Sequence, residues 1–113
     1  MSNKKPYRLI KDFEYPYEPK KRIVVFGGHD TFLKVIKPML PSVKYVDARM
    51  KQSFNPALVK NADIVLVQTN CISHRQFYNV VREAKKHNKK IKYFKYASAK
   101  KCADQVVAYD IIQ

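Results

Sequence analysis

The chain has no run of 18 consecutive apolar residues, so no segment of it is expected to cross a membrane. Its two cysteines, Cys71 and Cys102, are too few for a disulfide framework and do not form a C-x-x-C pair, so both are expected to be reduced thiols. The basic amino terminus is not followed by the apolar segment of a secretory signal. These absences predict a small soluble protein of the cytoplasm, with one domain in its 113 residues.

Acidic residues are also scarce. The chain has nine Asp and Glu residues and 23 Lys and Arg residues, which gives a formal net charge of +14. The excess is spread along the chain, because residues 1–22 carry +4 (7 basic, 3 acidic) and residues 23–113 carry +10 (16 basic, 6 acidic). Such a charge attracts polyanions such as nucleic acid, phosphorylated ligands or an acidic protein. A lysine-rich surface that serves solubility alone explains the same numbers, so both interpretations stay open.

Residues 1–21 lack helical or strand periodicity and contain three prolines, so they are predicted to form a basic, aromatic N-terminal arm ahead of a single domain at residues 22–113. Its aromatic side chains would pack on the domain, on a second subunit or on nucleic-acid bases, and packing on protein is the commonest of these arrangements. The arm therefore leaves a homodimer open as a partner. The aromatics concerned are Tyr7, Phe13, Tyr15 and Tyr17.

From residue 22 onward, β-type apolar segments alternate with helical patterns. Strands are predicted at 22–26, 43–46, 63–68 and 91–94. A short helix from Pro56 to about Asn61 follows a cap at Ser53 or Asn55, and Ser73 is placed to cap the next helix. The other helices have apolar residues spaced for one buried face, and the first is expected to end at Pro38 and Pro41. These faces are Phe32, Val35, Ile36 and Met39; Phe77, Val80, Val81 and Ala84; and Ala99, Cys102, Ala103 and Val106.

This alternation predicts an α/β fold with a four-stranded parallel sheet between two helical layers. Right-handed crossovers make 2-1-3-4 the favoured strand order, as in a small Rossmann-like or flavodoxin-like domain. Ligands of such sheets bind beyond the carboxyl ends of the strands, where the winding reverses. With this order, that point lies between the first and third strands.

Two polar loops are expected to meet at this point and form a crevice. Glycines allow close backbone approach, and two helix N-termini offer free N–H groups to an anion. We therefore predict a site for an anionic, nucleotide-like ligand, although tight turns and helix caps need the same residue types. The candidate residues are Gly27, Gly28, His29, Asp30, Thr69, Asn70, Cys71, Ser73 and His74, with Lys95 and Ser98 placed to close the site.

Two other functions remain open for this crevice. His29 and His74 would be the ligands of a metal ion or a haem iron, with Cys71 available as a third ligand. An enzyme acting on a phosphorylated substrate is the other alternative, with a histidine as acid–base. The sequence has neither a G-x-G-x-x-G nor a Walker A motif and shows no nucleophile–base pair, which favours a binding role over an enzyme.

A second basic feature lies at the end of the third predicted helix and in the fourth strand. Between Arg82 and Lys101 there are nine basic residues and one acid, Glu83. Lysines at a helix C-terminus suit the helix dipole, but their number exceeds what capping needs. The topology places them at the end of the sheet opposite the crevice, as a candidate phosphate-backbone surface. The residues are Lys85, Lys86, Lys89, Lys90 and Lys92.

The segment from about Ile23 to Tyr109 resembles a bacterial family known as domain of unknown function twenty-three twenty-five. The resemblance rests on a strand followed by Gly-Gly-His at 27–29, on Thr-Asn-Cys-Ile-Ser-His at 69–74, and on Ala-Lys-Lys at 84–86. It implies a Rossmann-like bacterial domain and no established activity. Asn70 stands where the family pattern also takes Asp, and the arm is not part of the pattern. The family-type positions are Gly27, Gly28, His29, Thr69, Asn70, Ser73 and His74.

Overall fold

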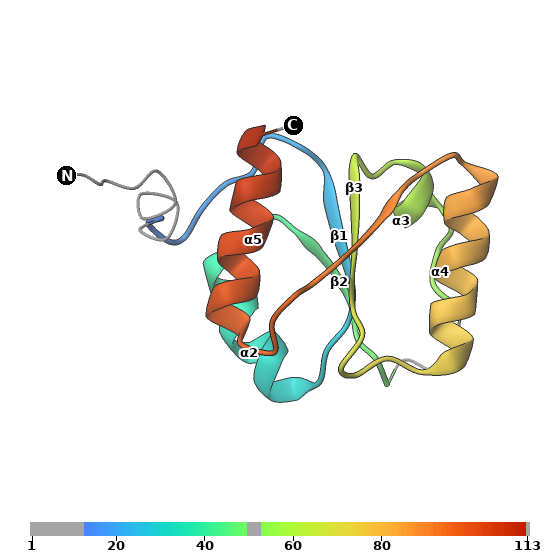
Figure 1. Ribbon diagram of the computed structural model, residues 1–113, viewed down its shortest axis with the longest axis horizontal. Coiled ribbons are helices and arrows are strands. Elements are labelled where there is room, and N and C mark those ends of the chain that lie inside the picture. Colours follow the sequence, from blue (N-terminus) through green and yellow to red (C-terminus); the bar gives the residue numbers. More distant parts are fainter. Residues whose placement is uncertain (1–12, 50–52, 113) are drawn as a thin grey trace.

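Four parallel strands form a single sheet at the centre of the domain. The computed structural model describes residues 13–49 and 53–112, and the sheet has the order β2-β1-β3-β4 (Figure 1). All three neighbouring pairs are parallel, so the predicted α/β class, parallel sheet and strand order are confirmed. The strands are β1 (Ile23–Gly27), β2 (Lys44–Val46), β3 (Ile64–Gln68) and β4 (Ile91–Tyr93).

Helices cover both faces of this sheet. In Figure 1, α2 and α5 lie on one side of the strands, and α3 and α4 lie on the other. This is the three-layer arrangement of Rossmann-like and flavodoxin-like domains. None of these helices, within the described ranges, has the length and apolar composition needed to cross a bilayer. The helices are α2 (Asp30–Met39), α3 (Ala57–Lys60), α4 (His74–Lys86) and α5 (Ala99–Ile112).

The two central strands explain why the fold forms. Every residue of β1 and β3 is buried, as expected for strands that helices cover on both faces. Successive β1 side chains alternate between two cores. Val25 packs in the core beneath α2 and α5, whereas Val24 and Phe26 pack in the core beneath α3 and α4.

The first helix differs from its prediction in two details. Val35 was expected in the core, but 46% of its surface is exposed, and Leu33 is buried in its place. The buried stripe runs through Phe32, Leu33 and Ile36 because α2 packs against α5 as well as against the sheet. Pro38 lies inside the helix rather than ending it. The helix stops one residue later, so the missing proline N–H interrupts only its final turn.

The described part of the N-terminal arm packs on the domain itself. The backbone N–H of Tyr17 donates to the Met39 carbonyl at 2.9 Å. The Tyr17 hydroxyl donates to Asp110 at 2.6 Å, and the Tyr15 hydroxyl donates to Asp104. Phe13, Tyr15 and Tyr17 all contact the core beneath α2 and α5. Of the three arrangements considered for the aromatics, these residues adopt packing on the body, while Tyr7 lies outside the described residues.

Candidate functional site

The loops after β1 and β3 touch at the carboxyl edge of the sheet, which is the lower edge in Figure 1. The backbone N–H of Gly28 donates to the carbonyl of Cys71 at 2.7 Å. This bond places the residues that follow it, His29 on one loop and His74 on the other, at the same edge. The two polar loops therefore meet where the strand order predicted.

Gly27 and Gly28 make this contact possible, and both have positive φ angles, of 95° and 91°. A Cβ atom on Gly27 would lie 2.6 Å from the carbonyl oxygen of Gln68 and 2.9 Å from that of Cys71. A Cβ atom on Gly28 would meet the ring of Phe32. Both glycines are buried, and the Gly28 N–H is already bonded, so their observed role is to let the loops approach.

Exposed polar side chains surround this contact. His29, Thr69, Asn70 and His74 are exposed, whereas Cys71 is half-buried. His29 occupies the N-cap position of α2 but makes no side-chain cap hydrogen bond, so the first N–H groups of this helix have no side-chain acceptor there. Ser73 caps α4 as predicted, because its Oγ accepts a hydrogen bond from the Gln76 N–H at 3.1 Å.

Two carboxylates and a guanidinium form an ion-pair cluster on the β1–β2 side of the site. The Arg49 guanidinium pairs with Asp47 at 3.2 Å and also with Asp30. Hydrogen bonds from Arg49 hold the pKa of Asp47 below its usual value. The Lys37 ammonium also lowers the Asp47 pKa, by a smaller amount, and both carboxylates already pair with Arg49.

The β3–β4 side is held together by Gln68, the buried last residue of β3. Its Nε2 donates to the Tyr96 carbonyl at 3.1 Å, and its Oε1 accepts from the Asn70 N–H at 3.2 Å. One side chain thus links the loop after β3 to the loop after β4. Gln68 was not among the predicted site residues, although a polar residue at the end of an otherwise apolar strand is a signal for it.

Positive charge gathers on this second side. The helices α4 and α5 both begin here, and Ser98 caps α5 by accepting from the Lys101 N–H at 3.4 Å. Arg75, Lys95 and Lys101 are exposed, and none of them makes an ion pair among the described residues. Two helix N-termini and these cations create a field that favours an anion on the β3–β4 side.

Residues 22–108 match the sequence profile of a family described as "Uncharacterized protein conserved in bacteria (DUF2325)". The chain belongs to this family. The match spans 87 of the 113 residues and includes all four strands and both loops of the candidate site. No curated protein and no solved structure gives a significant match. The family description names no activity, so the geometry of the site is what indicates the function of this DUF2325 chain.

The metal alternative has limited support in the described part of this DUF2325 chain. Within residues 13–49 and 53–112, no three His, Cys, Asp or Glu side chains are grouped so that they would hold a metal ion. Among the described residues, the predicted ligands His29 and His74 thus belong to no such group of three. The buried Cys102 is not available to such a site, and burial raises the pKa of its thiol to about 11.

The predicted lysine cluster lies at the amino edge of the sheet, where α4 ends, and the structure divides it. Lys85, Lys86 and Lys90 are exposed. Lys89 is engaged inside the domain, because its Nζ donates to the Ala62 carbonyl at 2.8 Å. Lys92 lies over the Tyr109 ring, with its Nζ 4.9 Å from the ring centroid. Three of the five lysines are therefore exposed and available to bind a polyanion.

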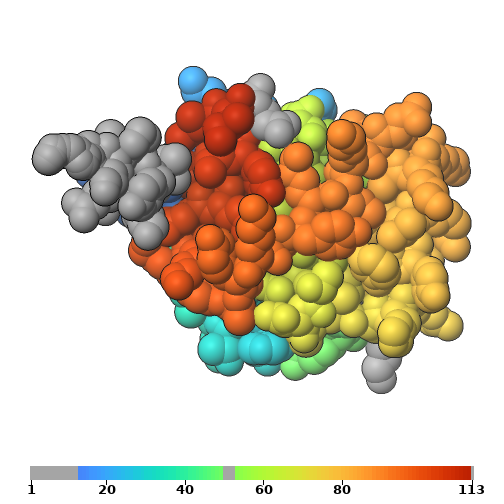
Figure 2. Space-filling view, viewed as in Figure 1, coloured from blue at the N-terminus to red at the C-terminus, as the bar shows by residue number. Residues whose placement is uncertain are grey.

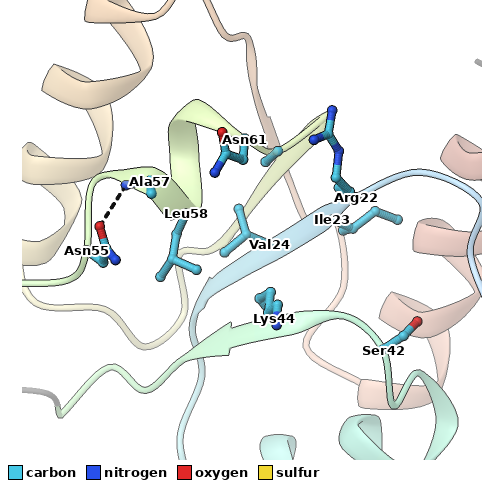
Figure 3. Close-up of a pocket in the computed structure, with 10 residues that line it drawn as sticks. Arg22, Ile23, Val24, Ser42, Lys44, Asn55, Ala57, Leu58 and Asn61 are labelled. Atoms are coloured by element: carbon cyan, nitrogen blue, oxygen red, sulfur yellow. Dashed lines mark hydrogen bonds between the residues drawn. The ribbon is translucent and has the colours of Figure 1, made fainter.

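A hollow that the sequence did not predict also lies at the amino edge, between α3 and the strands β1 and β2 (Figure 3). It has a volume of about 210 Å³. Val24 and Leu58 form its apolar part, and Arg22, Lys44 and Asn61 lie around it. Pockets for small molecules usually measure about 300–1,000 Å³. The hollow is therefore smaller than a typical ligand pocket.

Proposed function

We propose that this protein is a ligand-binding or regulatory domain that holds a nucleotide-like anion at the carboxyl edge of its sheet. The phosphates would lie on the β3–β4 side, between the N-termini of α4 and α5. The observation that carries the proposal is the Gln68 side chain, which fixes the Asn70 and Tyr96 backbones beside each other. A rigid frame of this kind keeps donors in place and lowers the entropy lost when a ligand binds.

Charge decides how the ligand would be oriented. The exposed cations Arg75 and Lys95 favour phosphate on one side, and the Asp30 and Asp47 carboxylates disfavour it on the other. These carboxylates accept hydrogen bonds, which suits the hydroxyl groups of a ribose. A nucleotide carries both kinds of group, so we expect it to bind more tightly than inorganic phosphate.

The basic surface supplies the second part of the proposal, a nucleic acid or an acidic partner bound outside the carboxyl edge. Six acidic residues from Asp30 onward are each paired with a side chain or backbone group of the domain. Exposed lysines such as Lys85, Lys86 and Lys90 thus have few acids left to neutralise them. A polyanion that binds them would release counterions, so its affinity should fall steeply as salt is raised.

Isothermal titration calorimetry with ATP tests the first part. Replacing Arg75 and Lys95 together with alanine should weaken ATP binding by about tenfold or more, because charge-assisted hydrogen bonds are lost. The matched control is Lys85→Ala with Lys86→Ala, which removes the same charge from exposed positions at the amino edge. The control should change ATP affinity much less.

Two outcomes would contradict the proposed anion site. Equal losses in the two double variants would mean that ATP responds to net charge and not to the carboxyl edge. An absence of binding heat for ATP and for inorganic phosphate at low salt would remove the site altogether.

A further inference from the structure

Three tyrosines of α4, β4 and the loop after β4 have exposed side chains. The exposed fractions are 68% for Tyr78 on α4, 43% for Tyr93 on β4 and 45% for Tyr96 in the loop after β4. They are the strongly exposed aromatic residues of the described ranges. In Figure 2, β4 and its neighbouring segments (orange) occupy the middle of the visible face, between α5 (red) and α4 (yellow). We call these three residues the tyrosine surface.

Contacts with the domain hold the Tyr93 ring and the Tyr96 backbone in place. The Tyr93 ring lies against Phe77 of α4, with ring centroids 6.4 Å apart. The Tyr96 carbonyl accepts hydrogen bonds from Gln68 Nε2 at 3.1 Å and from the Cys102 thiol at 3.1 Å. The exposed Tyr96 ring thus projects from a fixed backbone. Rigid aromatic rings offer a large contact area and lose little conformational entropy on binding.

The segments that carry these rings are rich in positive charge. Residues 74–101 contain ten Lys and Arg and a single acid, Glu83, so they contribute +9 of the net +14. Glu83 itself pairs with His87 at 3.5 Å. The Lys101 Nζ lies 5.5 Å from the Tyr96 ring centroid, which places a cation beside an exposed aromatic face. Aromatic rings alternating with cations are typical of surfaces that bind single-stranded nucleic acid.

The outer edge of β4 is closed to another strand near the tyrosine surface. The Gln105 carboxamide of α5 makes hydrogen bonds that a neighbouring strand would otherwise make. Its Nε2 donates to the Tyr93 carbonyl at 3.0 Å, and its Oε1 accepts from the Lys95 N–H at 3.0 Å. A partner chain therefore cannot pair with β4 through these groups unless it displaces Gln105. A partner would therefore contact the exposed side chains of the tyrosine surface and not the backbone edge of β4.

We propose that Tyr78, Tyr93 and Tyr96 stack on the bases of a single-stranded nucleic acid whose phosphates contact Lys101 and other exposed cations of α4, β4 and the start of α5. Charge complementarity favours this occupant, because a second copy of a chain with a net charge of +14 would bring like charges together. A duplex keeps its bases stacked inside, so the rings favour a single strand. The inference rests on the polyanionic part of the proposed function, and Tyr96 and Lys101 also border the anion site.

Fluorescence anisotropy with the whole protein tests the stacking. The probes are a labelled oligothymidine strand and a labelled duplex of equal length, each measured at low salt. Replacing Tyr93 and Tyr96 together with leucine should weaken single-strand binding by about tenfold or more, since each stacked base contributes substantially to affinity. Duplex binding, which depends on the phosphates, should change little.

The matched control is Tyr93→Phe with Tyr96→Phe, which keeps both rings and should bind the single strand as the wild type does. Thermal unfolding of each variant checks that the fold is retained. Unchanged single-strand binding by the leucine variant overturns the stacking surface and leaves the polyanionic proposal standing. No binding of either probe at low salt overturns both. A self-association of the wild type that the leucine variant abolishes would assign the rings to a protein interface and also overturns the proposal.

Discussion

Alanine in place of Gly27 is expected to lower the free energy of unfolding by about 4 kcal/mol or more, which is exceptional for a single methyl group. The new Cβ atom would lie 2.6 Å from the Gln68 carbonyl oxygen and 2.9 Å from that of Cys71. Both are backbone atoms of the β3 loop, so neither moves without displacing the loop. The backbone φ angle of 95° adds strain, because L-residues that carry a side chain rarely adopt it.

Gly28→Ala provides the comparison for this experiment. Its Cβ atom would also clash, but with the Phe32 ring, and a side chain has room to rotate where backbone does not. The loss should therefore be clearly smaller than for Gly27. The chain contains no tryptophan, so unfolding in urea is best followed by circular dichroism. A Gly27→Ala protein within about 1 kcal/mol of the wild type would mean that the two loops are not held as the structure has them.

Asp110→Asn is expected to give the second largest loss, about 3 kcal/mol of unfolding free energy, because it removes a buried charge that several donors surround. The residue is only 4% exposed. Its carboxylate accepts the Tyr17 hydroxyl at 2.6 Å and the backbone N–H groups of Lys20 and Lys21 at 3.1 and 2.9 Å. An asparagine would keep one acceptor oxygen but would turn an NH₂ group toward one of these donors. The arm would then lose much of its attachment to α5.

The same substitution should alter the pH dependence of stability. Burial raises the pKa of the Asp110 carboxyl, but hydrogen bonds from Tyr17, Lys21 and Lys20 outweigh it and hold this pKa below the ordinary value. The stabilisation is therefore complete above the unfolded-state pKa of about 4 and is lost as the pH falls through the folded-state pKa. Urea titrations from neutral to strongly acidic pH should show a flatter acid loss for Asp110→Asn than for the wild type.

Tyr17→Phe is the matched control for this prediction. It removes only one of the hydrogen bonds to Asp110 and should cost about 1 kcal/mol at neutral pH. Burial and the bond to Asp110 raise the Tyr17 pKa to about 12, so the phenol stays protonated throughout this experiment. If Asp110→Asn kept the acid sensitivity of the wild type in full, the assignment of that sensitivity to Asp110 would be wrong.

The sheet could be predicted because its residues respond to local physics. Ile23 to Phe26 and Ile64 to Val67 are continuous apolar runs, and such runs form strands that are buried on both faces. The handedness of crossovers then left few strand orders. The meeting of the GGH and NCISH loops followed from topology alone, so the sequence was sufficient to place His29 and His74 at one edge.

Other features depend on partners that are distant in the sequence. Gln68 binds Tyr96, and Asp110 binds Tyr17, across separations of 28 and 93 residues. No local pattern reveals such pairs. Leu33 replaced Val35 in the core because α5 packs against α2, which the periodicity of α2 alone does not show. The division of the site into an acidic and a basic side likewise depends on where Arg49 folds back between Asp30 and Asp47.

NMR observation of the histidine rings during a titration with ATP tests the central claim most directly. The chain has three histidines, and His87 at the C-terminal end of α4 serves as an internal control far along that helix from His74. We expect the imidazole signals of His74 and His29 to shift in a saturable manner, with the larger shift at His74, while His87 stays unchanged. Equal shifts at all three rings, or a shift confined to His87, would contradict an anion site at the carboxyl edge.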